Sequence, residues 1–107
     1  MDEETAYLYV LVRTDLSFPQ QAVQACHAAI ESTRQFPDPH SEHPYLVLCG
    51  VPDVNALTTA KARLEASGVP LAAFYEPDQA GSLTAVATRP LRGPERLPMR
   101  KYQCLRA

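Results

Sequence analysis

Residues 6–12 form a nearly continuous apolar run, Ala-Tyr-Leu-Tyr-Val-Leu-Val. The run is too short for a core helix and is rich in residues that favour β-strands. Because no polar residue interrupts it, we expect a central strand that is covered on both faces. Such a strand needs other elements packed on its sheet, which favours an α/β fold.

A helix start follows this strand. Ser17 is a natural N-cap, Pro19 suits the first helical turn, and Gln20 stands three residues after the cap, as in a capping box. The helix is expected to end near Thr33. Residues 35–44 contain three prolines and no periodic pattern, so they are predicted to form a loop.

The second half of the chain gives the same kinds of signal. Residues 44–51 predict another buried strand, and a second helix is bounded by Asp53 as N-cap and Gly68 as left-handed C-cap. Residues 71–75 and 82–89 predict two further strands joined by a short turn. The β-α-β-α-β-β order implies parallel crossovers followed by an antiparallel hairpin. It therefore predicts a four-stranded mixed sheet with helices packed on it.

The chain has 107 residues, 46% of them hydrophobic, which suits one domain with one core. We expect a single domain over residues 1–107, with its core at about residues 6–90 and a basic C-terminal segment at residues 91–107. Residues 99–105 could add a short edge element to the sheet.

The charges are unevenly distributed along the chain. The last nineteen positions contain six basic residues and one acid, Glu95, so this segment has a net charge of +5. The rest of the chain has a net charge of −7. A basic tail on an acidic body would suit contacts with nucleic-acid phosphates. The alternatives are a solubilising tail or an interface with another subunit's acidic surface. The six basic residues are Arg89, Arg92, Arg96, Arg100, Lys101 and Arg106.

The sequence predicts a cytoplasmic protein that has no membrane partner. It contains no run of about 18 apolar residues of the kind that spans a bilayer. Its first residues, Met-Asp-Glu-Glu, are acidic where a secretory signal is basic. Cys26, Cys49 and Cys104 are widely spaced and are interpreted as buried or incidental thiols.

The first predicted helix has two different sides at about 100° per residue. We expect its apolar side to lie on the sheet and its polar side to face outward. The polar side is either a solvated surface or a surface that a polar ligand approaches, since it offers neutral hydrogen-bonding groups beside small alanines. The apolar side consists of Val23, Cys26, Ala29 and Ile30, and the polar side of Gln20, Gln24, His27 and Glu31.

Acidic residues follow two of the predicted strands. Asp15 ends the first strand, and Glu76 and Asp78 lie in the turn after the third. Because α/β sheets place ligand-handling residues at the carboxyl ends of strands, these acids and His27 could share a cleft. A carboxylate there could act as general base on a water molecule. The alternative role of each acid is a helix cap or a turn residue.

Neither a metal site nor a cofactor is expected. Asp38, His40, Glu42 and His43 are possible zinc ligands, but they lie in a proline-rich loop without a further residue to complete a tetrahedron. The sequence lacks a Gly-rich phosphate loop and a Gly-x-Ser-x-Gly elbow, which disfavours nucleotide hydrolysis and covalent catalysis.

Two separated motifs resemble those of type II peptidyl-tRNA hydrolases. Residues 9–16, Tyr-Val-Leu-Val-Arg-Thr-Asp-Leu, are followed by residues 24–29, Gln-Ala-Cys-His-Ala-Ala, as at the start of that family. Residues 81–84, Gly-Ser-Leu-Thr, followed by Ala87 and Pro90, resemble the family's Gly-Thr-x-Thr strand with its terminal proline. With the β-α-β-α-β-β order, the resemblance covers about residues 6–90.

In that family a Gln of the first helix, an acid after the third strand and a Thr of the final strand are regarded as active-site groups. The resemblance places the Gln at Gln24 and the acid at Glu76, or alternatively at Asp78. Ser82 corresponds to the Thr, and Thr84 follows two residues later.

The family also has a Lys one turn before the active-site Gln, and Gln20 stands at that position here. A proline in place of the family's lysine run, together with Gln-Ala-Cys-His-Ala, makes the chain look closest to the divergent peptidyl-tRNA hydrolase domain-containing subgroup.

The resemblance implies hydrolysis of the ester between a peptide and the 3′ end of tRNA by an activated water. Gln24 and His27 would position substrate and water, and Glu76 would polarise the water. Ser82 and Thr84 would bind the carbonyl or the terminal ribose. Further substrate contacts are expected from Asp15, Gln20, Asp78, Arg92, Arg96, Arg100 and Lys101.

The alternative is a catalytically inactive tRNA-binding or protein-binding module on the same fold, suggested by neutral Gln20 at the lysine position. The family analogy also allows a homodimer.

Overall fold

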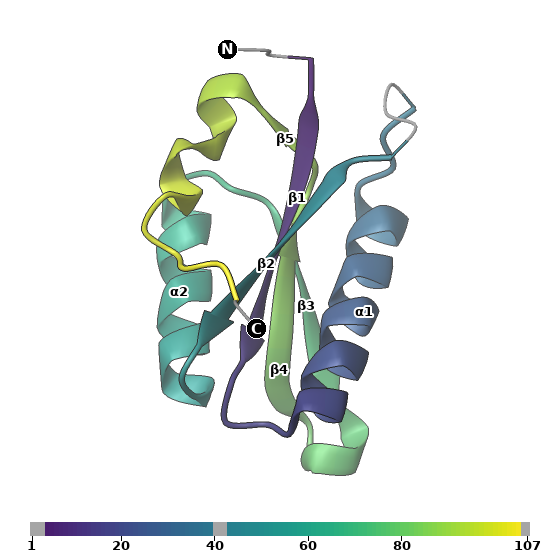
Figure 1. Cartoon of the computed structure of the whole chain (residues 1–107), viewed down its shortest axis with the longest axis vertical. Helices are drawn as coiled ribbons and strands as arrows, with labels where there is room; N and C mark the ends of the chain where they lie inside the picture. The colour runs from purple at the N-terminus through teal and green to yellow at the C-terminus, as the bar shows by residue number, and fades with distance from the viewer. Residues whose placement is uncertain (1–3, 40–42, 106–107) are drawn as a thin grey trace.

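A computed structural model describes residues 4–39 and 43–105 of the protein (Figure 1). Its two helices and its strands follow the predicted α/β order, and two 3₁₀ segments are added. In chain order the elements are β1 (Ala6–Arg13), α1 (Phe18–Gln35), β2 (Tyr45–Val51), α2 (Val54–Ala66), β3 (Leu71–Glu76), η1 (Pro77–Gln79), β4 (Ser82–Thr88), β5 (Leu91–Arg92) and η2 (Gly93–Met99).

The sheet is mixed, as predicted, with the strand order β2-β1-β4-β3. β1 and β2 are parallel from the Tyr7↔Tyr45 pair to the Arg13↔Val51 pair, and β4 runs antiparallel to both β1 and β3. The sequence predicted four strands, and the structure adds β5, which pairs with the start of β1.

Residues 103–105 lie along the outer edge of β2. The Gly50 amide donates to the Gln103 carbonyl at 3.1 Å, and the Leu105 amide donates to the Leu48 carbonyl at 2.8 Å. The predicted short edge element is thus a single antiparallel bridge, between Cys49 and Cys104.

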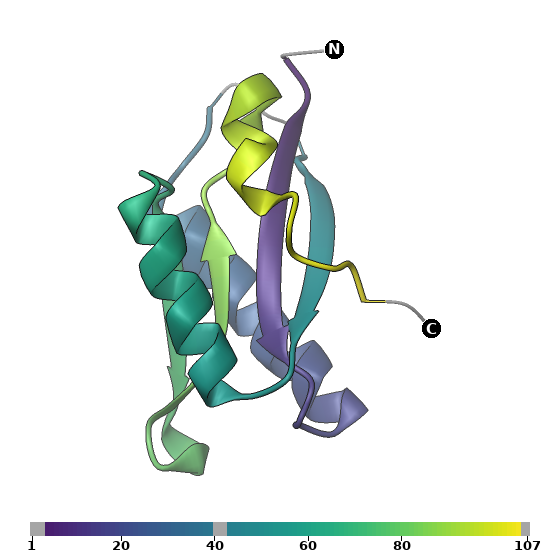
Figure 2. The same cartoon turned by 90° about the vertical axis from the view of Figure 1, so that its left-hand side faces the viewer.

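β1 is covered on both faces, as its apolar run predicted. α1 lies on one face of the sheet, and α2 and η2 lie on the other (Figure 2). Leu8, Val10 and Val12 are buried toward α1, whereas Leu11 belongs to the core on the α2 side. None of the helices in residues 4–39 and 43–105 is long and apolar enough to cross a bilayer.

α2 packs as its sequence implies. Leu57, Ala60 and Leu64 are buried against the sheet, the Asp53 side chain accepts the amide proton of Ala56 at 2.8 Å, and Gly68 has a φ of 83°. A left-handed backbone favours glycine at that position.

The predicted orientation of α1 is wrong. The helix buries Gln21, Gln24, Ala28 and Ser32, whereas Val23 and Ile30 are 47% and 54% exposed. Small Ala28 allows close approach to the sheet, and the buried polar groups find hydrogen-bond partners there, so their burial costs little. Ser32, for example, donates to the Thr88 carbonyl at 2.7 Å.

Candidate active site

Gln24 is the centre of a hydrogen-bonded cluster near the carboxyl ends of β1 and β3. Its Nε2 donates to Glu76 Oε1 at 3.0 Å and to Gln20 Oε1 at 3.3 Å. Thr84 Oγ1 donates to Gln24 Oε1 at 2.8 Å. Gln24 and Thr84 are completely buried, so the prediction that Gln24 lies on an open helix face is wrong.

These bonds fix which way the Gln24 amide points. Because the Glu76 carboxylate can only accept, the amide nitrogen must face it, and the amide oxygen then accepts from Thr84. Gln24 therefore acts as a positioning residue, because its amide nitrogen holds the Glu76 carboxylate in place. Glu76 Oε1 accepts this bond, and Oε2 remains to accept a proton from a water or a substrate hydroxyl.

The backbone around Glu76 turns sharply. Ala80 and Gly81 have positive φ angles of 56° and 71°, and the Gly81 amide donates to the Glu76 carbonyl at 3.0 Å. This tight return through η1 leads directly into β4, where Ser82 pairs with Glu76. The turn thus brings the acid of β3 beside the first hydroxyl of β4.

Arg13 and Asp15 form a second cluster at the same end of the sheet. The guanidinium binds Asp15 through two bonds of 3.0 and 2.8 Å, and its Nη1 donates to Ser82 Oγ at 2.6 Å. The hydrogen bond from Arg13 lowers the pKa of Asp15, and the same bond raises the pKa of Arg13. Since Ser82 Oγ accepts from a cation, its own proton is free to donate to an oxygen of the substrate.

Gln21 holds the loop between β1 and α1 through its Nε2, which donates to the Leu16 carbonyl at 2.7 Å. A hollow of about 400 Å³ opens beside this loop, lined by Thr14, Leu16, Ser17, Phe18, Gln21 and Leu105. Phe18 is 85% exposed there, which leaves an apolar ring open to solvent at the start of α1.

His27 and Asp78 take no part in the hydrogen bonds of these two clusters. The His27 ring is half-buried and stacks on Phe74, with ring centroids 4.3 Å apart and 8° between the planes. Asp78 is exposed in η1. Of the two acids that the sequence left open, Glu76 is the one bonded to Gln24.

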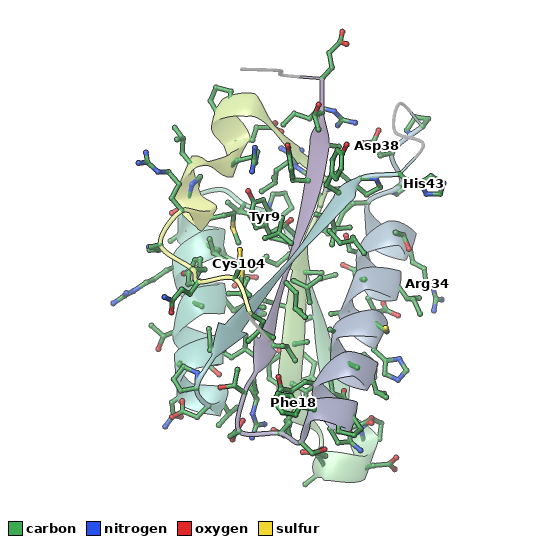
Figure 3. The ribbon with its side chains drawn as sticks, viewed as in Figure 1. Tyr9, Phe18, Arg34, Asp38, His43 and Cys104 are labelled. Carbon is green, nitrogen blue, oxygen red and sulfur yellow. The ribbon has the colours of Figure 1, made fainter. Side chains whose placement is uncertain are left out.

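The predicted basic contacts lie elsewhere. η2, which carries Arg96, is at the end of the molecule opposite η1 and the β1–α1 loop (Figure 1). Arg92 binds Asp38 at 2.6 Å, and Figure 3 shows Asp38 at the end opposite Phe18. The structure therefore does not bring Arg92, Arg96, Arg100 and Lys101 together with the Gln24 cluster.

Sequence reasoning did not single out Arg13 as a site residue. A charged pair two residues apart at the end of a buried strand, Arg-Thr-Asp, was the available signal. Its bond to Ser82, 69 residues away, depends on the tertiary fold.

No group of three ligand-type side chains that could hold a metal occurs within residues 4–39 and 43–105. His40 and Glu42, two of the possible zinc ligands in the proline-rich loop, lie outside these described residues.

Comparisons with known proteins identify the family to which the chain belongs. A comparison with curated proteins finds no match. Among solved structures the chain is similar to a protein of unknown function, Atu0240 from Agrobacterium tumefaciens strain C58, with a TM-score of 0.70 and 14% identity over 99% of this chain and 100% of the other. At that identity the likeness concerns the fold alone. The family model described as peptidyl-tRNA hydrolase PTH2 matches residues 6–95, so the chain belongs to the peptidyl-tRNA hydrolase PTH2 family.

Proposed function

We propose that this protein is a cofactor-free hydrolase that cleaves the ester between a peptide and the 3′ end of tRNA. The observation that carries the proposal is the partly buried bond from Gln24 to Glu76, 3.0 Å long and anchored by Thr84. A carboxylate oriented in this way is suited to general-base chemistry. Such a reaction serves translation, which supports a cytoplasmic site of action.

Glu76 acts as the general base. It takes a proton from a water molecule while the water oxygen bonds to the ester carbonyl carbon. The resulting intermediate collapses by breaking the bond to the ribose oxygen, which receives the proton back from Glu76. The products are a peptide carboxylic acid, which ionises, and tRNA with a free ribose hydroxyl.

Ser82 donates to the oxygen that becomes negative during this attack. Its hydroxyl is polarised by Arg13 at 2.6 Å, and a fixed donor of this kind stabilises a developing oxyanion. In this scheme Gln24 and Thr84 position the base, and exposed Gln20 and Asp15 border the substrate.

The test is release of peptide from a labelled peptidyl-tRNA by the purified protein. Glu76→Gln should lower kcat about 10²- to 10⁴-fold, the usual contribution of a general base. Glu65→Gln is the matched control, the same substitution at an exposed acid on α2, on the other face of the sheet from α1, and it should retain the wild-type rate. Wild-type turnover no faster than buffer would refute catalysis by this chain.

A second candidate function is a catalytically inactive module that binds tRNA or a protein. It is favoured by Gln20, a neutral residue at the family's lysine position. A cation there would stabilise negative charge in the transition state better than an amide dipole does. If the wild type binds tRNA without cleaving it while Gln20→Lys cleaves it, the natural chain is the inactive module.

We also propose a homodimer. The support is an apolar surface formed by α1 and β2 that no other element covers. In this surface the side chain of Ile30 is 54% exposed and that of Leu46 is 69% exposed. Both residues line a hollow of about 260 Å³ over Leu8.

A further inference from the structure

The basic residues fall into two groups according to their partners. The structure describes nine of the ten Lys and Arg residues. Five of them are paired with acids within 4 Å: Arg13, Arg34, Lys61, Arg89 and Arg92. The other four form no ion pair with an acid in the described part of the chain. These are Arg63, Arg96, Arg100 and Lys101.

The four cations without acid partners share one side of the molecule. η2 and the residues after it carry three of them, and η2 lies on the same face of the sheet as α2, which carries Arg63 (Figure 2). Arg63 and Tyr102 line one hollow of about 350 Å³, and Lys101 lies 5.7 Å from the centroid of the Tyr102 ring. Arg96 and Arg100 line a second hollow, of about 270 Å³.

Tyrosine rings lie among these cations. The Arg96 guanidinium lies 3.5 Å from the centroid of the Tyr7 ring, and Tyr7 stacks on Tyr45 with centroids 5.4 Å apart. Tyr45 is 65% exposed, so much of its ring is open to solvent. Arg96 and Tyr45 therefore both contact Tyr7, and Tyr45 adds an accessible aromatic ring to this cluster.

We propose that this surface, defined by Tyr45, Arg63, Arg96, Arg100, Lys101 and Tyr102, binds a single-stranded segment of RNA. An unpaired base stacks on Tyr45, and the phosphates on either side contact Arg100 and Lys101. Aromatic platforms combined with unpaired cations are suited to this ligand. An acidic peptide would match the charge but would make little use of the exposed tyrosine ring.

The surface is separate from the Gln24 cluster. η2 and the η1 turn lie toward opposite ends of the longest axis, along which the molecule extends 38 Å (Figure 1). At the candidate active site Arg13 is paired with Asp15, and Glu76 and Asp78 add negative charge, so this end attracts phosphates less than the basic surface does. The proposal rests on tRNA as the substrate, and it assigns an unpaired segment away from the 3′ end to the basic surface, because the 3′ end itself must reach Glu76.

Fluorescence anisotropy with a labelled, unacylated tRNA and with a labelled eight-nucleotide single strand tests the site. Tyr45→Ala should weaken binding of both about tenfold, within the range for loss of one stacked base, whereas Tyr45→Phe keeps the ring and should bind like the wild type. The double variant Arg100→Glu, Lys101→Glu should reduce the slope of log K against log salt by about 1.4, or about 0.7 for each lost phosphate contact.

Arg34→Glu is the matched charge-reversal control, because Arg34 is exposed at the end of α1, on the other face of the sheet. The Arg34→Glu variant should keep the RNA affinity, and the slope of log K against log salt, within twofold of the wild-type values. A blunt RNA duplex should compete more weakly than the single strand.

The site is refuted if Tyr45→Ala and the double variant bind both RNAs as tightly as the wild type does, or if the blunt duplex competes equally well. This outcome differs from failure of the proposed hydrolase. Peptide release that Glu76→Gln abolishes, together with RNA binding that none of these variants changes, would retain the hydrolase and reject this surface. RNA binding that depends on Tyr45, without peptide release, would retain this surface and reject the hydrolase.

Discussion

Gln24 occupies a position on α1 where an apolar side chain would ordinarily lie, since none of its surface is exposed. A buried amide is tolerated there because all its bonds are made inside the protein: both its protons and its oxygen are used. Substitution of Gln24 should therefore destabilise the protein, because removal of its amide leaves Thr84 and Glu76 without these hydrogen bonds.

Gln24→Ala should therefore lower the free energy of unfolding by about 3 kcal/mol, through the cavity and the lost bonds to Thr84 and Glu76. Urea denaturation followed by circular dichroism would measure the change. Gln20→Ala removes the exposed partner of the same amide and should cost less than about 0.5 kcal/mol. Equal urea midpoints for Gln24→Ala and the wild type would show that the cluster does not stabilise the fold.

Cys49 should react far more slowly than the other two thiols. Burial, together with neighbouring Cys104, raises the pKa of Cys49 to about 12, so its reactive thiolate is scarce at pH 8. Cys26 and Cys104 are exposed. Alkylation with iodoacetamide, followed by mass spectrometry, should give two rapid additions and a third only after unfolding. Cys49→Ala should keep the two rapid additions, and three rapid additions in the wild type would contradict this prediction.

At the scale of elements, the strands and α2 could be predicted because apolar runs and helical spacing report burial directly. Leu57, Ala60 and Leu64 of α2 are buried as their spacing implies. α1 could not be oriented in this way, since hydrophobicity does not record that Gln24 and Ser32 have partners on β4.

The candidate site was predictable to a similar degree. The rule that ligand-handling residues follow strand ends selected Asp15 and Glu76, which the structure places at one end of the sheet. Their partners depend on tertiary contacts. The bond from Arg13, the partner of Asp15, to Ser82 spans 69 residues, so the sequence gives no sign of it. The roles assigned to these residues remain predictions.

The loop that joins β1 to α1 should lose stability in acid. Its Asp15 has a pKa below the usual 3.8 because of Arg13, so the ion pair contributes above that pH and is lost as the pH falls through the lowered value. Asp15→Asn should cost less than about 1 kcal/mol at pH 7, since the pair is partly exposed. Urea denaturation at several pH values should show this difference shrinking below pH 3.8. A difference that stays constant down to pH 2.5 would exclude the ion pair as its cause.

On the scale of the whole molecule, one face of the sheet is incompletely covered. α1 lies over β1, β3 and β4, and β2 extends beyond it with Leu46 and Leu48 exposed. Contiguous apolar surface of this kind marks interaction sites. Ile30 lines the same hollow as Leu46, and Val23 is also exposed on α1. These two residues are half of the apolar side that the sequence predicted to lie on the sheet.

Light scattering coupled to size-exclusion chromatography should therefore find a dimer, which Leu46→Asp converts to a monomer by placing a charge in the interface. Leu97→Asp is the matched control, a leucine that is 53% exposed on η2, and it should remain dimeric. A wild-type protein that stays monomeric at about 100 µM would contradict the proposed homodimer.

The pairing of residues 103–105 with β2 should protect the molecule against aggregation. An unpaired strand edge is a template on which another chain can add, and sheet proteins commonly cover such edges. Gly50 allows this cover to sit close, since a methyl group at its position would come within 2.5 Å of the Leu105 side chain. A larger residue at position 50 would meet the Leu105 and Thr14 side chains, and the backbone of β2 would be exposed wherever Leu105 gives way by leaving the edge. Fibrils or soluble aggregates would then form from molecules whose cores are still folded.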